Sequence, residues 1–340
     1  NKPRLTAGTR AGNGAPQREV LMRKFVAILV AALIALPCAA WAQAWPSRPI
    51  KFVIPFGPGS ASDALARIAG QELSQTLGQQ VVVIHKPGAD GAIAAVEVQR
   101  SPPDGYTFLF GTNSPLAVAP NLRKDAGYDP IKDFTPVTFL GDNTFFVVVH
   151  PSVPAASIAE LVSYAKANPG KLDYAAGNTF AMVSMSMFGT RNGIDMQAVP
   201  YKSEPDAIVD LLAGRVRVMN ATVTTVGPHI RDGKLRALST SFGQRSALLP
   251  DVPSLTEAGQ PEFPVGPWFA LVGPAGLPRD IVDRMSREMA AALAKPQVRE
   301  PMLRQGFVPR SSTPEELAAY IRSQLSVWRT ALKDAGIEQQ

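Results

Sequence analysis

The sequence contains a single cysteine in 340 residues, and this residue, Cys38, lies in the N-terminal segment. A chain that loses this segment has no cysteine, so it can form no disulfide and use no thiolate nucleophile. Histidine is also scarce, and His85, His150 and His229 do not have the spacing of a metal-binding motif. The sequence has neither a metalloprotease motif nor a Gly-x-Ser-x-Gly nucleophile elbow. We therefore expect no metal, no cofactor and no covalent catalysis.

Nucleotide-binding and nucleic-acid-binding patterns are weak as well. Gly57-x-Gly59 lacks the third glycine of a dinucleotide fingerprint, and no Gly-Lys-Ser/Thr phosphate loop occurs. The formal charge of +6 looks basic, but residues 1–42 hold six of the 34 basic and one of the 28 acidic residues. The rest of the chain keeps 28 basic and 27 acidic residues, a net charge of +1. This balance gives no electrostatic support for binding nucleic acid or an anionic membrane.

An export signal is predicted near the N-terminus. Met22–Lys24 is a short positive stretch, Phe25–Leu36 carries no charge, and Ala40–Ala42 fits a cleavage site. The uncharged run is shorter than the ~20 residues of a membrane-spanning helix. We therefore expect cleavage after Ala42, with residues 1–21 upstream of the natural start. A core helix and lipidation of Cys38 are the alternatives.

The compartment follows from the same segment. Export together with a cysteine-free mature chain favours the bacterial periplasm, where exposed thiols are oxidised. The predicted location is thus the periplasm, reached through a cleavable signal peptide.

Strands and helices alternate along the remaining chain. The opening predicts strands at 50–55, 80–85 and 106–111 and helices at 61–77 and 92–100. This order predicts a mostly parallel sheet with helices on both faces, and the run Val81–Ile84 predicts a strand buried on both faces. The middle predicts strands near 173–176, 195–200, 216–220 and 237–241, with helices at 157–168, 181–192, 204–213 and 223–232. The end predicts helices at 278–294, 296–306 and 313–335.

Two apolar segments that end in proline look like crossings between two lobes. They are Phe145–Pro151 and Trp268–Pro274. If both cross, residues 43–146 and 270–340 form the first lobe and residues 147–269 the second. The predicted fold is α/β, with two lobes and a cleft between them, and small ligands often bind in such clefts.

Several predicted strand-to-helix turns combine a hydroxyl with an acid three residues later. The pattern begins at Ser60, Ser203 and Ser254, and glycines precede the first turn at Gly57 and Gly59. Glycine lets a ligand approach the backbone, and a helix N-terminus can hold a carboxylate through free N–H groups. Simple helix capping is the alternative interpretation of each turn.

The segment Trp45–Asp63 resembles the Bug/TctC extracytoplasmic solute receptors of tripartite tricarboxylate transporters. Further segments that resemble this family are Lys86–Gly91, Pro103–Thr107, Tyr128–Phe134, Ala165–Leu172, Val199–Lys202, Gly233–Leu238, Leu249–Pro253 and Pro274–Gly276. The resemblance implies a type II periplasmic binding protein, a Venus flytrap that closes on a small carboxylate. It also implies an inner-membrane permease of the tripartite tricarboxylate type as partner.

The resemblance also implies a ligand site made of loops from both lobes. The first lobe would contribute Phe56, Gly57, Gly59, Ser60, Ala61, Ser62, Gly88, Ala89, Asp90, Gly91, Thr112, Asn113 and Ser114. The second lobe would contribute Asn178, Thr179, Tyr201, Lys202 and Ser203. No catalytic residue is expected among them.

Departures from the family suggest the ligand class. Met182 stands near the place of a frequent histidine, and Ala221 stands where aspartate is frequent. A second lobe with fewer polar groups would disfavour a second ionised group, because burying an unpaired charge is costly. We therefore expect a monocarboxylate with an apolar or aromatic body to bind more tightly than citrate. Lys202 is the counter-argument, because it could receive a second carboxylate.

Two other functions share parts of this pattern. A sensory receptor that presents its ligand to a membrane signalling partner would need the same pocket and differ in the partner. A periplasmic enzyme would need a nucleophile or metal constellation, which the sequence does not show. The sequence leaves open the ligand, the permease, the oligomeric state and the choice between transport and sensing.

Overall fold

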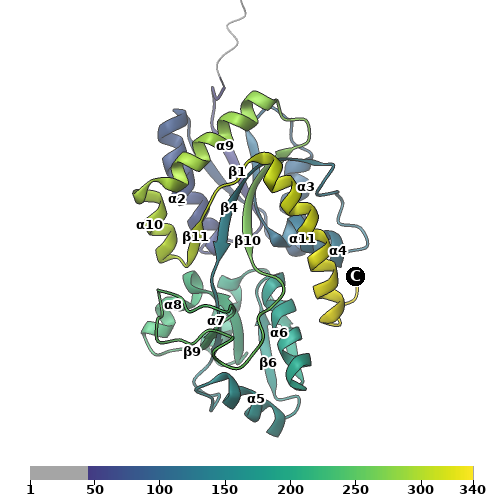
Figure 1. Ribbon diagram of the computed structural model, residues 1–340, viewed down its shortest axis with the longest axis vertical. Coiled ribbons are helices and arrows are strands. Elements are labelled where there is room, and N and C mark those ends of the chain that lie inside the picture. Colours follow the sequence, from purple (N-terminus) through teal and green to yellow (C-terminus); the bar gives the residue numbers. More distant parts are fainter. Residues whose placement is uncertain (1–44, 340) are drawn as a thin grey trace, which may run out of the picture. The chain divides into compact units, whose positions relative to one another are not determined.

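The computed structural model describes residues 45–339. The predicted export signal, its cleavage after Ala42 and Cys38 lie outside these residues. Within the described range, no helix combines the length and the apolar composition that crossing a membrane requires. The strands of this range form two sheets, each flanked by helices (Figure 1).

The first sheet has six strands, three of which the sequence pattern predicts as a parallel group. It consists of β1 (Ile50–Ile54), β2 (Val81–His85), β3 (Thr107–Thr112), β4 (Phe134–Asn143), β10 (Trp268–Pro274) and β11 (Phe307–Pro309). The order is β11-β4-β10-β3-β1-β2. β1 pairs in parallel with β2 and β3, as expected, while β10 runs antiparallel between β3 and β4. β4 and β11, which the sequence pattern does not predict, complete the sheet.

The second sheet has five strands and a similar mixed design. It consists of β5 (Phe145–Val149), β6 (Leu172–Ala176), β7 (Met196–Pro200), β8 (Val218–Thr222) and β9 (Arg236–Thr240), in the order β7-β6-β8-β5-β9. β6 pairs in parallel with β7 and β8, and β5 runs antiparallel to β8 and β9. The predicted α/β fold with two lobes is confirmed.

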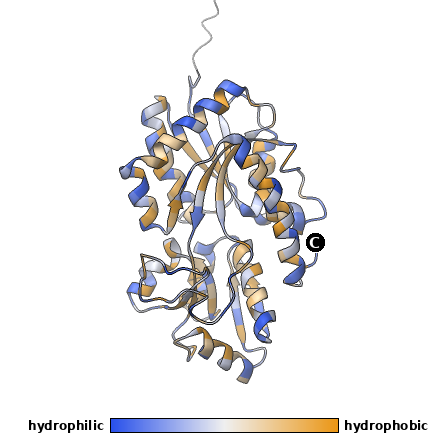
Figure 2. Ribbon diagram, viewed as in Figure 1, coloured by the Kyte–Doolittle hydropathy of each residue, from blue (hydrophilic) through white to orange (hydrophobic). Residues whose placement is uncertain are grey.

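Helices cover both faces of each sheet. Around the first sheet lie α2 (Ala61–Leu77), α3 (Ala92–Gln99), α4 (Ala119–Leu122), α9 (Arg279–Ala294), α10 (Pro296–Arg304) and α11 (Pro314–Asp334). Around the second lie α5 (Ile158–Ala167), α6 (Thr179–Asn192), α7 (Glu204–Leu212) and α8 (Val223–Arg231). Side chains alternate between the faces of a strand, so in β1 Phe52 packs with α2 and α9 while Val53 packs with α3 and α11. In Figure 2 the strands are mainly hydrophobic and the helices mix both kinds of residue.

The helix α2 shows why these residues form these elements. Ser60 begins the helix as its N-cap, with the side chain accepting a hydrogen bond from the Asp63 N–H, and Gly78 ends it in the left-handed conformation. Leu65, Ala69 and Leu73 recur at helical spacing and are fully buried. The observed bounds are those that the sequence predicts.

The prediction that β2 is buried on both faces was wrong. β2 is the last strand of the first sheet, and the Val82 side chain is 42% exposed. An apolar run of this length predicts a strand, but it does not distinguish a central strand from an edge strand.

The chain passes between the two sheets beside the segments that the sequence marks as crossings. β5 pairs only within the second sheet and β10 only within the first, and Thr144 alone separates β4 from β5. The Asn143 N–H donates to the Pro267 carbonyl at 3.2 Å, and the Thr144 N–H donates to the Gly306 carbonyl at 2.8 Å. The two passages are therefore hydrogen-bonded to each other through Asn143 and Pro267. The lobe boundaries drawn from the sequence stay a prediction.

Candidate functional site

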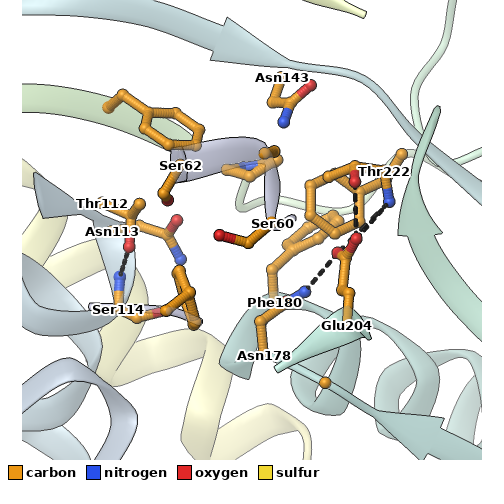
Figure 3. Close-up of a pocket in the computed structure, with 16 residues that line it drawn as sticks. Ser60, Ser62, Thr112, Asn113, Ser114, Asn143, Asn178, Phe180, Glu204 and Thr222 are labelled. Atoms are coloured by element: carbon orange, nitrogen blue, oxygen red, sulfur yellow. Dashed lines mark hydrogen bonds between the residues drawn. The ribbon is translucent and has the colours of Figure 1, made fainter. Parts of the chain in front are cut away.

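A cavity lies between the two sheets, at the carboxyl ends of β1, β3, β6, β7 and β8 (Figure 3). In open α/β sheets, ligands bind outside the carboxyl ends of parallel strands, where the connecting loops diverge. Here the loops of one sheet face those of the other. The sequence-predicted residues that line this cavity are Phe56, Ser60, Ala61, Ser62, Thr112, Asn113, Ser114 and Asn178.

The wall from the first sheet offers hydrogen-bond donors to a ligand. Ser62 lies in the first turn of α2 and is 1% exposed, and Asn113 follows β3 and is 3% exposed. Within residues 45–339, Ser62 Oγ and Asn113 Nδ2 have no hydrogen-bond partner, although buried polar atoms nearly always have one. The first N–H groups of a helix also lack partners inside the helix and favour negative charge. This wall is therefore suited to an anion.

Asp63 fixes the loop that carries this wall. Its carboxylate accepts hydrogen bonds from the Gly59 N–H at 3.0 Å and from Arg67 Nε at 2.8 Å, and it lies 2.9 Å from His85 Nε2. Burial alone would raise the pKa of Asp63, but the Gly59 N–H, His85 and Arg67 outweigh it and hold the pKa below its usual value. Asp63 thus ties the loop after β1 to β2 in its ionised form.

We expect this tie to make stability depend on acid pH. A carboxylate whose pKa is lower in the folded than in the unfolded protein stabilises the fold. This contribution is complete above the unfolded-state pKa of about 3.9, and it is lost as the pH falls through the folded-state pKa. Asp63→Asn should therefore lower stability at pH 7 by about 1–3 kcal/mol and flatten the loss below pH 4. Urea unfolding from pH 7 to pH 3 measures both. Asp232→Asn is the control, because the Asp232 side chain is 57% exposed. An equal effect of both substitutions on stability would contradict the role of Asp63 in holding the loop after β1.

The wall from the second sheet carries a buried carboxyl group. Glu204, the first residue of α7, is 6% exposed and accepts hydrogen bonds from uncharged donors only. The donors are Asn178 Nδ2 at 2.8 Å, the Thr222 N–H at 3.1 Å, Thr222 Oγ1 at 2.6 Å and Thr225 Oγ1 at 2.8 Å. Burial raises the pKa of Glu204, although these hydrogen bonds act against the rise. Among the described residues that line the cavity, Glu204 is the one ionisable side chain.

Aromatic rings separate these polar walls. Phe145 and Phe180 meet edge to face with ring centroids 5.0 Å apart, and Phe56 and Phe269 also line the cavity. Polar and aromatic side chains therefore line the cavity together, as is common for sites of small organic ligands.

A second, more exposed cavity adjoins the first and shares Phe56 and Asn178 with it. The other predicted residues that line it are Gly88, Ala89, Asp90, Gly91, Thr179, Tyr201 and Lys202. Asp90 is paired with Arg123 at 3.0 Å. Lys202 therefore lies at the outer cavity and does not line the inner one.

Three predicted residues line neither cavity. A Cβ on Gly57 would lie 3.7 Å from Ser203 Oγ, and a Cβ on Gly59 would lie 3.9 Å from the Pro205 ring. These residues thus bring the loops of the two sheets together beside the cavities. Ser203 is the N-cap residue of α7, but its Oγ donates to Asp206 Oδ2 at 2.7 Å, so the predicted side-chain cap was wrong there.

The sequence analysis missed several residues of the inner cavity. They are Asn143, Phe145, Phe180, Glu204, Thr222, Pro267 and Phe269. The second sheet still supplies polar groups to the cavity, because Asn178, Glu204 and Thr222 line it, while Ala221 is buried in the core. Within residues 45–339, no three His, Asp or Glu side chains form a group that could hold a metal ion.

The chain is similar to known proteins over most of its length. The sequence model described as "Tripartite tricarboxylate transporter family receptor" matches residues 65–337. Protein BugT of Bordetella pertussis is 35% identical over 306 residues, which are 89% of this chain and 93% of that protein.

Solved structures of the same kind of protein are also similar to this chain over most of its length. An R. palustris protein solved with adipate is 32% identical with a TM-score of 0.84, and the match covers 87% of this chain and 100% of that one. MatC from Rhodopseudomonas palustris, solved with bound malate, is 29% identical with a TM-score of 0.79, and the match covers 85% of this chain and 100% of that one.

Proposed function

We propose that this chain, which belongs to the tripartite tricarboxylate transporter family of receptors, captures a small carboxylate in the inner cavity for uptake by a membrane permease. The carrying observation is a pair of buried donors without partners within residues 45–339, Ser62 Oγ in the first turn of α2 and Asn113 Nδ2 directly after β3. The adipate and malate in the solved relatives support the ligand class.

The proposed capture needs no cation. Hydroxyl, amide and backbone N–H donors can replace the water around a carboxylate, and the helix dipole adds a favourable field. Binding is the whole reaction in this proposal, so the ligand should leave the protein chemically unchanged. The mass spectrum of a carboxylate recovered after prolonged incubation checks this point, and a converted product would favour an enzyme instead.

We further propose that the two lobes, residues 43–146 with 270–340 and residues 147–269, close on the ligand about the passages at Thr144 and Pro267. The hydroxyl of Thr179, the first residue of α6, donates to Ser114 Oγ after β3 at 3.1 Å, and moving the two lobes apart would break this bond. In such a hinge mechanism the ligand binds the closed state more tightly than the open state, so its binding shifts the protein toward the closed state.

This proposal makes a prediction for the free protein in solution. The ligand-free protein should populate an open form, so small-angle scattering should show a smaller radius of gyration after a bound carboxylate is added. Thr179→Val, which removes the closing hydroxyl, should reduce the compaction. An unchanged scattering curve at saturating ligand would contradict hinge closure.

The location and the partner are part of the same proposal. A periplasmic receptor released by cleavage after Ala42 would deliver its ligand to an inner-membrane permease of the tripartite tricarboxylate type. N-terminal sequencing of the protein from a periplasmic extract should begin at Gln43. An intact N-terminal segment in the membrane fraction would refute the predicted cleavage.

Native mass spectrometry of freshly purified protein tests the function directly. We expect a retained small acid whose mass is lost after partial unfolding and dialysis, and Asn113→Leu protein should retain less of it. A retained neutral or cationic metabolite would overturn the carboxylate proposal.

A further inference from the structure

Asn143 is a buried side chain of the inner cavity that no part of the fold uses. It is the last residue of β4 and is 3% exposed, and neither its Nδ2 nor its Oδ1 has a hydrogen-bond partner within residues 45–339. Its backbone is held at the hinge by the Pro267 carbonyl. Figure 3 shows the Asn143 side chain at the edge of the cavity, on a different segment from Ser62 and Asn113, with its amide nitrogen directed toward the cavity. A buried amide without partners at a cavity indicates a ligand group that it binds.

Glu204 gives this end of the cavity a distinct electrostatic character. A carboxylate has about four lone-pair sites, and the side chains of Asn178, Thr222 and Thr225 together with the Thr222 N–H supply four donors. Three of these donors contact Oε2 and the Asn178 amide contacts Oε1, so hydrogen bonds hold the group without a cation. Its charge still acts on the cavity, because screening is weak at a buried position.

We propose that Asn143 and Glu204 make the site selective for a monocarboxylate whose far end carries a neutral hydrogen-bonding group, a hydroxyl or a carboxamide. The proposal rests on the proposed function, since it places the ligand's carboxylate on Ser62 and Asn113. Asn143 binds the neutral group, and Glu204 excludes a second carboxylate. Both are specificity-determining residues of the cavity.

The chemistry of Asn143 selects a neutral partner. Its amide offers donors on Nδ2 and an acceptor on Oδ1, so a hydroxyl or a carboxamide, which can both donate and accept, satisfies both atoms. A methyl group would leave both atoms bare at a cost comparable to a lost hydrogen bond.

Glu204 acts on a second carboxylate through like charge. Two carboxylates in one buried site cannot both ionise at low cost, so one of them must take up a proton. Burial raises the pKa of Glu204, whereas its hydrogen bonds from Thr222, Thr225 and Asn178 act against the rise and favour the charged form. A diacid must therefore bind with an extra proton or bind weakly. This chain should differ in that respect from the relatives solved with adipate and malate.

Two series of acids of matched length test the proposal. The first is hexanoate, 6-hydroxyhexanoate and adipate, and the second is butyrate, 4-hydroxybutyrate and succinate. Isothermal titration of ligand-stripped protein at pH 7.5 should show that the hydroxy acid of at least one series binds about tenfold or more tightly than its diacid and its alkyl acid. This ranking needs no variant.

Variants then assign the effect to residues. Glu204→Gln keeps the size of the side chain and should improve the binding of the diacid about tenfold relative to the hydroxy acid. Asn143→Leu should bring the hydroxy acid and the alkyl acid to equal affinity. Asp206→Asn removes a carboxylate from an exposed position on the same helix. It should change neither the affinity of the diacid nor that of the alkyl acid relative to the hydroxy acid. Circular dichroism melts verify that each variant is folded.

The outcomes separate this proposal from the function on which it rests. Tighter binding of adipate or succinate than of either hydroxy acid by the wild-type protein would overturn the proposal and leave the carboxylate function standing. If folded Glu204→Gln protein kept the wild-type ratio of diacid affinity to hydroxy acid affinity, this result would also overturn the proposal. Binding of none of the six acids would count against the carboxylate function itself.

Discussion

Replacing Asn113 by leucine is expected to weaken carboxylate binding about 10- to 100-fold. The Asn113 amide donates from a buried position, and a hydrogen bond to a charged group contributes about 1.5–3 kcal/mol. Leucine keeps the size of the side chain and removes the donor, so the loss reports the hydrogen bond. Isothermal titration with the tightest-binding acid measures it.

Two comparisons make the Asn113 result specific. Asn168→Leu changes the same residue type at the end of α5, where the amide bonds the Tyr164 carbonyl, and should leave affinity unchanged. The methyl ester of the same acid should bind wild-type and Asn113→Leu protein about equally, because the ester carries no charge. An equal loss for acid and ester would mean that Asn113 shapes the cavity without holding the carboxylate.

Replacing Gly91 by alanine is expected to destabilise the protein by about 2–4 kcal/mol. Gly91 has φ +85°, a conformation that strains an L-residue, and a Cβ there would lie 2.9 Å from both Pro55 Cβ and Pro115 Cδ. Proline rings cannot swing away, so the loops after β1, β2 and β3 would have to move apart. Urea unfolding at neutral pH measures the difference.

Gly193 provides the matched control for Gly91. It also has positive φ, at +63°, but a Cβ there meets nothing within 4 Å. Gly193→Ala should therefore cost only the backbone strain, about 1 kcal/mol. If the two substitutions cost the same, the contact between Gly91 and the two prolines does not constrain the loops of the site.

Local signals in the sequence predicted much of the fold. The N-caps at Ser60 and Thr313 and the glycine at Gly78 mark helix ends where the structure has them, because capping depends on residues only a few positions apart. The edge position of β2 was missed because strand order depends on partners far away in the chain. β4 was missed for a related reason, since its pairing with β10 joins segments more than 100 residues apart.

The sequence predicted more of the candidate site on the side of the first sheet than on the side of the second. The glycine and hydroxyl pattern at Gly59, Ser60 and Ser62 marked the loop after β1, and the structure places Ser60 and Ser62 on the inner cavity. Glu204 and Asn143 gave no local signal. An acid in the first turn of a helix and an asparagine at a strand end are common on protein surfaces. Only the approach of the two sheets buries them in the same cavity.

A crystal structure of the protein with the tightest-binding acid of the two series would test the central claim most directly. We predict that the ligand lies in the inner cavity, with its carboxylate oxygens about 3 Å from Ser62 Oγ and Asn113 Nδ2. Its far end should contact Asn143. A ligand bound outside this cavity, or a carboxylate turned toward Glu204, would contradict the account.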